Sequence, residues 1–101
     1  MAKKLYPISP GEILLEEFMS PLGLSQNQLA RDLGVNPARV HEIVRGRRGI
    51  SAETALRLAT YFRTSPEFWL NLQTRYDLKV AENSHGTAIK KSVRPIAARA
   101  A

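Results

Sequence analysis

The sequence contains no cysteine and few aromatic residues, with one Trp, three Tyr and three Phe among 101 residues. The absence of cysteine excludes disulfides, thiol catalysis and cysteine-ligated zinc or iron–sulfur centres. No apolar run approaches the roughly 20 residues of a membrane-spanning helix. The basic N-terminus is also not followed by the apolar core of a signal peptide. We therefore expect a cytoplasmic protein without a membrane partner.

Acidic residues are scarcer than basic ones, 9 against 15, which gives a net charge of +6. Such a balance favours an anionic partner, which is a nucleic acid, a membrane surface or an acidic protein. Four basic residues and no acidic residue lie after position 82, whereas residues 1–82 hold eleven basic and nine acidic residues. Within that body, one local cluster comprises Arg39, Arg45, Arg47 and Arg48. The positive charge is therefore concentrated in two separate places.

Apolar residues repeat at helical spacing along most of the chain, between recognisable start and stop signals. The predicted helices cover residues 12–19, 25–33, 37–45, 52–62 and 66–80. The expected N-caps of the last four helices are Ser25, Asn36, Ser51 and Ser65. Pro21 and Gly23 are expected to end the first helix. No strand-like alternation of useful length is present, so the pattern predicts an all-α domain over residues 1–82.

The periodicity fades from Asn83 onward. Residues 84–87 have the composition of a loop, and the segment after them is basic and rich in alanine, with Pro95 interrupting any long helix. We therefore predict a flexible basic tail over residues 83–101. It either adds nonspecific phosphate contacts or serves as a solvated tail.

Two of the predicted helices, residues 25–33 and 37–45, are joined by the short turn Gly34-Val35-Asn36. Glycine allows the chain to change direction sharply in such a turn. The small side chain of Ala30, on the predicted inner face, allows the second helix to pack closely across the first. A helix-turn-helix pair of this kind places its second helix in the DNA major groove, with N-terminal residues at the base edges.

Polar and basic side chains lie on the predicted outer surface of this pair. Near the start of its second helix, Arg39 is a candidate for a bidentate guanine contact and Ala38 for a thymine methyl contact. Asn36 is a candidate for a contact to a base or a phosphate. Candidates for phosphate contacts are Ser25, Gln26, Gln28, Arg45, Arg47 and Arg48. His41 either contacts a base or faces solvent. A solvated helical hairpin with surface arginines would show the same pattern, so DNA binding is a hypothesis at this point.

Residues 9–81 resemble the HigA-type antitoxin family, a branch of the Xre-like helix-turn-helix regulators. The matching stretches are Pro10–Phe18, Pro21–Gln26, Leu33–Val35, Gly46–Ser51, Thr54–Ala59, Ser65–Gln73 and Tyr76–Leu78. They keep their order and spacing over about three-quarters of the chain. The segment Phe68–Gln73 is the most distinctive, because it separates this group from generic phage-repressor-like domains.

The resemblance implies a five-helix, phage-repressor-like fold, a homodimer and binding to an operator in the protein's own promoter. It also implies a partner toxin that cleaves mRNA on the ribosome. By family position, Gln26, Asn36, Ala38 and Arg39 match DNA-contacting positions, whereas Pro37 stands where relatives often carry a polar side chain. The leading hypothesis is therefore the antitoxin of a type II toxin–antitoxin module, acting as an autorepressor. Two alternatives stay open, a stand-alone regulator without a toxin and a protein-binding antidote that does not contact DNA.

The fifth predicted helix is apolar around more than one face, which suggests a second burial partner. Trp69, Leu72 and Tyr76 are predicted to contact a second subunit or the toxin, with core packing as the alternative. Glu12, Glu16 and Glu17 form a solvated acidic face, and a toxin contact there is open. Catalytic carboxylates would require a cleft, which a surface helix does not offer. His85 has no companion at metal-ligand spacing. We therefore expect neither an enzyme nor a metal or cofactor.

Overall fold

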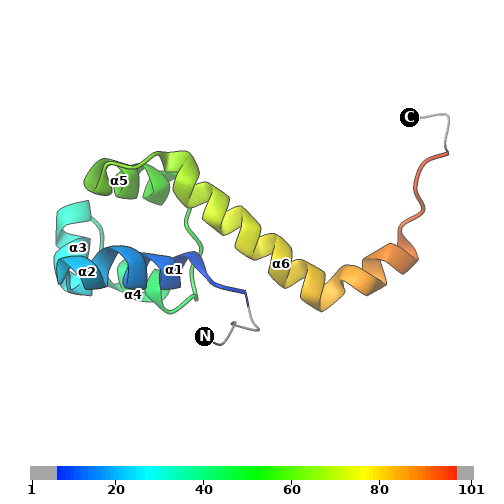
Figure 1. The fold of residues 1–101 in the computed structure, drawn as a ribbon, viewed down its shortest axis with the longest axis horizontal. Helices are drawn as coiled ribbons and strands as arrows, with labels where there is room; N and C mark the ends of the chain where they lie inside the picture. Colours follow the sequence, from blue (N-terminus) through cyan, green and yellow to red (C-terminus); the bar gives the residue numbers. More distant parts are fainter. Residues whose placement is uncertain (1–6, 98–101) are drawn as a thin grey trace.

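Five helical rods follow one another through residues 7–97, which are the residues that the computed structural model describes, and no strand forms within them (Figure 1). The first rod is continuous and consists of α1 (Pro10–Ile13), η1 (Leu14–Met19) and α2 (Ser20–Leu22). The remaining rods are α3 (Gln26–Leu33), α4 (Pro37–Val44), α5 (Ala52–Phe62) and α6 (Pro66–Ser92). The predicted five-helix, all-α fold is confirmed.

Side-chain caps start the helices where the sequence predicted them. The side-chain oxygens of Ser25, Asn36, Ser51 and Ser65 each accept a hydrogen bond from a backbone N–H in the first turn, at 2.8–3.2 Å. Ser9 caps the first rod in the same way, at 3.2 Å. Each cap satisfies a backbone donor that has no partner inside its helix, and typically contributes about 1 kcal/mol.

The first rod continues through Pro21 to Leu22, so the prediction that Pro21 helps to end it is wrong. Its middle part, η1, is a π-helix, and the N–H of Ser20 bonds to the carbonyl of Leu15, five residues back. A proline lacks the N–H of the regular helical ladder and crowds the preceding turn. Here the ladder is already shifted immediately before the proline. The rod ends at Gly23, as predicted, in the left-handed conformation.

The hydrophobic core lies between the rods and draws side chains from all five of them and from the loop before α5. It comprises Leu14, Met19, Leu29, Ala30, Leu33, Val40, Ile43, Ile50, Ala55, Leu58, Ala59 and Trp69. Phe18 and Phe62 pack beside Trp69, with ring centroids 4.8 Å and 6.1 Å from it. The first turns of α6 thereby close the bundle against α5 and the first rod.

Gly11 permits a close backbone crossing between α1 and α4. A Cβ atom at this position would collide with the carbonyl oxygen of Ile43. Because α1 lies directly on the backbone of α4, the core side of α4 is covered and its opposite side remains open to solvent.

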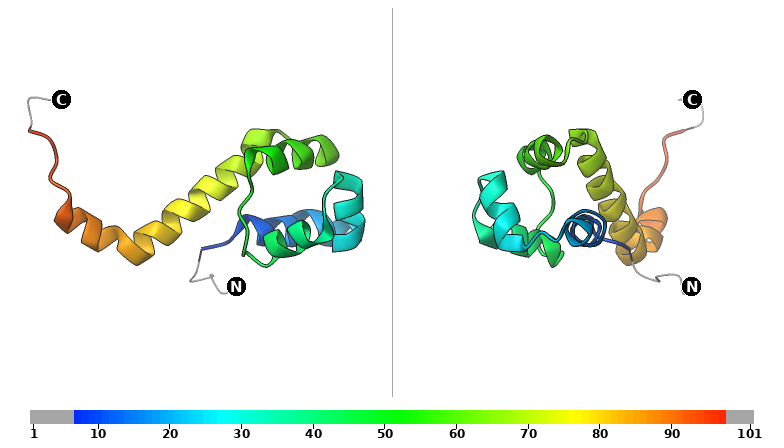
Figure 2. Two further views of the ribbon diagram at one scale, coloured as in Figure 1. Left: turned by 180° about the vertical axis from the view of Figure 1, so that it is seen from behind. Right: turned by 60° about the vertical axis from the view of Figure 1, so that its left-hand side comes forward.

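The long helix α6 extends past Val80 to Ser92, so the predicted loop at residues 84–87 is wrong. The helix projects from the bundle and changes direction within residues 80–88, in the orange-yellow part of Figures 1 and 2. Ser84 and Gly86 lie in this stretch, and such residues favour a bend. The boundary predicted after residue 82 therefore falls inside a helix. Residues 98–101 of the predicted tail lie outside the described residues.

Within residues 7–97, none of the helices has the length and apolar character required to cross a membrane. The same part of the chain contains no cluster of His, Asp and Glu side chains that could hold a metal ion.

Candidate nucleic-acid interface

The helices α3 and α4 form a tightly joined pair. Gly34 adopts a left-handed conformation, with φ = 74°, and the N–H of Val35 bonds back to the carbonyl of Ala30 at 3.0 Å. Ala30 is fully buried, so its small side chain sits where the two helices approach each other. On α4, Val40 and Ile43 face the core. The pair therefore presents the opposite face of α4 outward.

This outward face carries several of the predicted contact residues. Asn36, Ala38, His41 and Arg45 are all exposed along it. The Oδ1 atom of Asn36 caps α4 through the N–H of Ala38, at 2.8 Å. The amide –NH₂ of Asn36 therefore remains as the donor for an external acceptor. Pro37, also exposed, can offer only apolar contact beside it.

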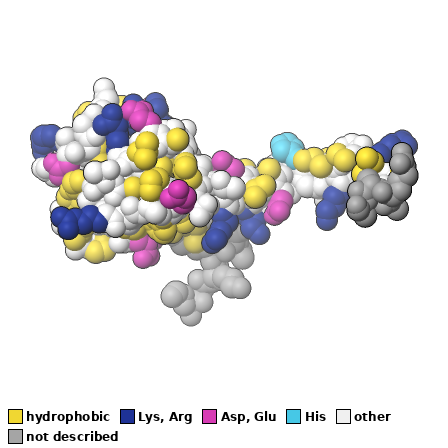
Figure 3. All heavy atoms as spheres, turned by 90° about the horizontal axis from the view of Figure 1, so that it is seen from above, with side chains coloured by type: hydrophobic (Ala, Val, Ile, Leu, Met, Phe, Trp, Pro, Cys, Tyr) yellow, Lys and Arg dark blue, Asp and Glu magenta, His cyan; other side chains and the backbone are white. Residues whose placement is uncertain are grey.

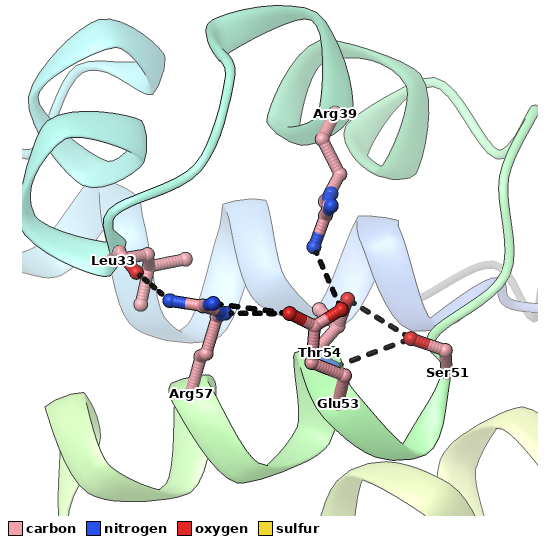
Figure 4. A network of polar contacts seen from close by, with 6 residues as sticks. All are labelled: Leu33, Arg39, Ser51, Glu53, Thr54 and Arg57. Atoms are coloured by element: carbon pink, nitrogen blue, oxygen red, sulfur yellow. Dashed lines mark hydrogen bonds and ion pairs between the residues drawn. The ribbon is translucent and has the colours of Figure 1, made fainter.

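Arg39 behaves differently, because its side chain points from α4 towards α5 (Figure 4). Its Nη1 atom lies 3.4 Å from Oε1 of Glu53, and its side chain is 30% exposed. Arg57 binds the other oxygen of Glu53 at 3.0 Å and donates to the carbonyl of Leu33 at 2.8 Å. The hydrogen bond from Arg57, together with the positive charges of Arg39 and Arg57, lowers the pKa of Glu53. The predicted guanine-contacting side chain is thus paired with a carboxylate.

Gln28 is engaged by its neighbours. Its Nε2 atom donates to Oδ1 of Asp32 at 2.8 Å, and its Oε1 atom accepts from Arg31 at 2.9 Å. Tyr61 of α5 donates to the other oxygen of Asp32 at 2.8 Å, and this hydrogen bond raises the pKa of Tyr61. Both polar atoms of the Gln28 side chain are therefore hydrogen-bonded within α3. A contact to a phosphate would require Gln28 to break its bond to Asp32.

Gln26 occupies the first position of α3, beside the exposed cap residue Ser25. The Oε1 atom of Gln26 is buried and has no hydrogen-bond partner among the described residues. A buried amide oxygen without a partner is costly. This oxygen is therefore an acceptor that the described residues leave unused.

A basic loop follows α4. Arg45, Arg47 and Arg48 are exposed around Gly46, which has φ = 75°. The Nε atom of Arg48 donates to Oε1 of Glu42 at 2.8 Å. Arg45 and Arg47, by contrast, form no ion pair within residues 7–97. Their charge is therefore available to an anionic ligand, whereas that of Arg48 is partly offset.

The polar side chain of Gln73, on α6, holds this loop in place. Its Oε1 atom accepts the N–H of Ile50 at 2.7 Å, and its Nε2 atom donates to Asp77 at 2.9 Å. Gly49 lies against the same side chain, since a Cβ there would come within 3.1 Å of Nε2. Gln73 lies in the distinctive segment Phe68–Gln73, but the sequence pattern does not predict this role for it. The available signal was a polar residue at the end of an apolar stretch.

The predicted partner-contacting residues separate into two groups. Trp69 is fully buried, and its Nε1 atom donates to the hydroxyl of Thr64 at 2.8 Å. The prediction that Trp69 contacts a partner is therefore wrong, because the bundle itself covers the whole side chain. Leu72 and Tyr76 instead line an open groove of about 360 Å³. Its other walls are Pro7, Ile8, Ile13, Arg75 and Lys79.

Two short helices joined by a glycine turn, with an open outer face on the second and a basic loop after it, define a helix-turn-helix protein. Residues 15–69 match the helix-turn-helix family. Virulence-associated protein I of Dichelobacter nodosus is 59% identical over 75 residues, which cover 74% of this chain and 69% of that relative.

Two solved structures narrow the class. An addiction module antidote protein of a HigA family from Coxiella burnetii is 52% identical, with a TM-score of 0.85 and coverage of 90% of this chain and 99% of that chain. The Pseudomonas aeruginosa antitoxin HigA, solved with higBA promoter, is 46% identical, with a TM-score of 0.87 and the same coverage. The chain belongs to the HigA-type antitoxin family of helix-turn-helix regulators, which are not enzymes.

Proposed function

We propose that this protein binds operator DNA through the outer face of α4 and represses transcription from its own promoter. The observation that carries the proposal is the exposed row Asn36, Ala38, His41 and Arg45, which lies opposite the buried face of α4. The unpaired charges of Arg45 and Arg47 favour phosphate binding beside it. The presence of promoter DNA in the structure of the HigA relative supports the same assignment.

The contacts divide into two kinds. Asn36, Ala38 and Arg39 contact bases, with His41 beside them. Ser25, Gln26, Gln28, Arg45, Arg47 and Arg48 contact phosphates. Phosphate contacts set the affinity and position of the helix, whereas base contacts set the sequence preference.

Binding of the protein to its own upstream region, measured by fluorescence anisotropy across a salt series, tests this function. We expect specific binding that weakens as salt rises, because phosphate contacts release counterions. Arg39→Ala should cost roughly 1–3 kcal/mol at one base pair and relax the preference there. Unchanged sequence preference in this variant would show that Arg39 does not contact a base. The absence of any specific binding would favour an antidote that acts only on protein.

We also propose a homodimer in which Leu72 and Tyr76 contribute to the interface. Their groove is apolar and open, and it lies between α6 and the start of the first rod rather than on the α4 face. A two-fold dimer would place the two α4 helices in successive major grooves, with half-sites about 34–36 Å apart or a multiple of that distance. Sedimentation equilibrium of Tyr76→Asp measures the assembly, which we expect to weaken.

The final part of the proposal is a partner toxin that cleaves mRNA on the ribosome. Its support is membership of the HigA-type family. Co-expression with the product of the neighbouring gene, followed by co-purification and promoter binding with and without that product, tests the partnership. A stable complex supports the antitoxin function. Operator binding without any complex would instead identify a stand-alone regulator.

A further inference from the structure

We propose that Glu53 is a specificity-determining positioning residue, which holds Arg39 for contact with a base and withholds it from phosphates. This inference rests on the proposed function, in which Arg39 contacts a base pair of the operator. It adds a residue of α5 to the determinants of sequence preference, which the sequence pattern places entirely in and beside α3 and α4.

The geometry fixes Glu53 from two sides (Figure 4). Arg57 binds Oε2 of Glu53 through both Nη2 and Nε, at 3.0 Å and 3.3 Å. The same guanidinium donates to the carbonyl of Leu33, at the end of α3, at 2.8 Å. Oε1 of Glu53 is left facing Arg39, at 3.4 Å. Through these contacts the side chain of Arg39, on α4, is linked to the first turn of α5 and to the end of α3.

The pair of Arg39 and Glu53 contributes little to the stability of the fold. The side chain of Glu53 is 58% exposed and that of Arg39 is 30% exposed. Ion pairs at such exposure contribute little to folding, because water and salt screen them. A carboxylate beside Arg39 would instead reduce the attraction of that side chain to phosphates, because it offsets the positive charge.

The consequence is a difference between specific and nonspecific binding. A free arginine side chain samples many rotamers and reaches phosphates on any sequence. An arginine held by Glu53 has fewer accessible orientations, and a bidentate guanine contact depends on the orientation of its planar guanidinium. The carboxylate therefore lowers the affinity for all DNA. It lowers the affinity least for an operator that carries the base pair contacted by Arg39.

The test compares Glu53→Gln with Glu53→Asp. The first removes the charge and keeps the length of the side chain, whereas the second keeps the charge and shortens the reach to Arg39. The matched control is Glu82→Gln, an identical charge change at an exposed position on the projecting part of α6. Affinity is measured for the operator, for an operator altered at the base pair contacted by Arg39, and for unrelated DNA.

For Glu53→Gln we expect nonspecific binding to tighten by about three- to tenfold, with a salt dependence steeper by about one counterion, because Arg39 becomes free to bind a phosphate. Discrimination between the operator and its altered form should fall by about the same factor. Glu53→Asp should lose discrimination without the gain in nonspecific affinity. Glu82→Gln should change neither ratio, and circular dichroism confirms that each variant is folded.

Unchanged discrimination in Glu53→Gln, alongside lost discrimination in Arg39→Ala, would overturn the role of Glu53 and leave the proposed function intact. If Arg39→Ala also left discrimination unchanged, both the role of Glu53 and the assignment of Arg39 would fail. A loss of discrimination in both Glu53 variants, with no change in Glu82→Gln, supports the proposal.

Discussion

Gly11 and Gly86 both lie in helices, yet their surroundings predict opposite effects of an added methyl group. At Gly11 the methyl would collide with the carbonyl of Ile43, so Gly11→Ala should separate α1 from α4 and cost roughly 1–3 kcal/mol or more. At Gly86 the nearest atom is 3.9 Å away, so Gly86→Ala should stabilise α6 locally by about 0.5–1 kcal/mol. Urea unfolding followed by circular dichroism compares them. Equal stability of Gly11→Ala and the parent would disprove the close crossing.

Arg47 offers a test of phosphate binding, because its charge is exposed and forms no ion pair within residues 7–97. Arg47→Ala should weaken binding to the operator and to unrelated DNA by the same factor. It should also lower the slope of log K against log salt by roughly 0.9. Arg47→Lys keeps the charge and should restore most of the slope. A loss confined to the operator would instead indicate that Arg47 contacts a base.

Contacts between residues close in the sequence can be predicted from it, whereas contacts between helices cannot. Helix caps were predicted correctly because a cap and its partner N–H lie within three residues, as in Ser25 and Gln28. The pairing of Arg39 with Glu53 spans 14 residues and two helices. Periodicity placed Arg39 off the buried face of α4 but carries no information on which neighbouring element lies beside it.

At the scale of elements, the predicted end of α6 was wrong for a reason that helix energetics explains. Residues 83–87 are weak helix formers, and taken alone they indicate a loop. Good helix formers lie on both sides, however, including Ala81, Glu82 and Ala88. Extending an existing helix costs far less than starting one. The helix therefore continues through the weak residues with a bend. In the same way, the first rod continues through Pro21 after a π-helical turn.

Gln73 connects α6 to the loop between α4 and α5, and this link can be tested as a unit. Gln73→Met keeps the length of the side chain but leaves the N–H of the buried Ile50 without its acceptor, which should cost roughly 1–3 kcal/mol. Amide hydrogen exchange at Ile50 should quicken accordingly. Asp77→Asn disturbs only the other partner of Gln73 and should leave that exchange nearly unchanged. Slow exchange at Ile50 in Gln73→Met would mean that another acceptor replaces Gln73.

At the scale of the whole molecule, the excess of apolar residues in α6 predicted a second burial partner without indicating where it binds. The described chain buries Trp69 within its own bundle and leaves Leu78 and Ile89 of α6 exposed, at 58% and 49%. Figure 3 shows hydrophobic side chains along the part of α6 that projects from the bundle. A single sequence identifies such residues as apolar. Whether their side chains face the bundle or solvent depends on where α6 leaves the bundle, and tertiary packing determines that point.

The proposed dimer makes a geometric prediction about its operator. Two α4 helices related by a two-fold axis require half-sites on the same face of the duplex, about one helical turn or a multiple of it apart. After footprinting locates the half-sites, inserting five base pairs between them should place them on opposite faces and reduce binding to that of one half-site. Inserting ten base pairs restores the face but separates the half-sites, so binding should recover only in part. An isolated half-site serves as the reference. Affinity that is indifferent to both insertions would show that each subunit binds alone, and the homodimer would then have no part in operator recognition.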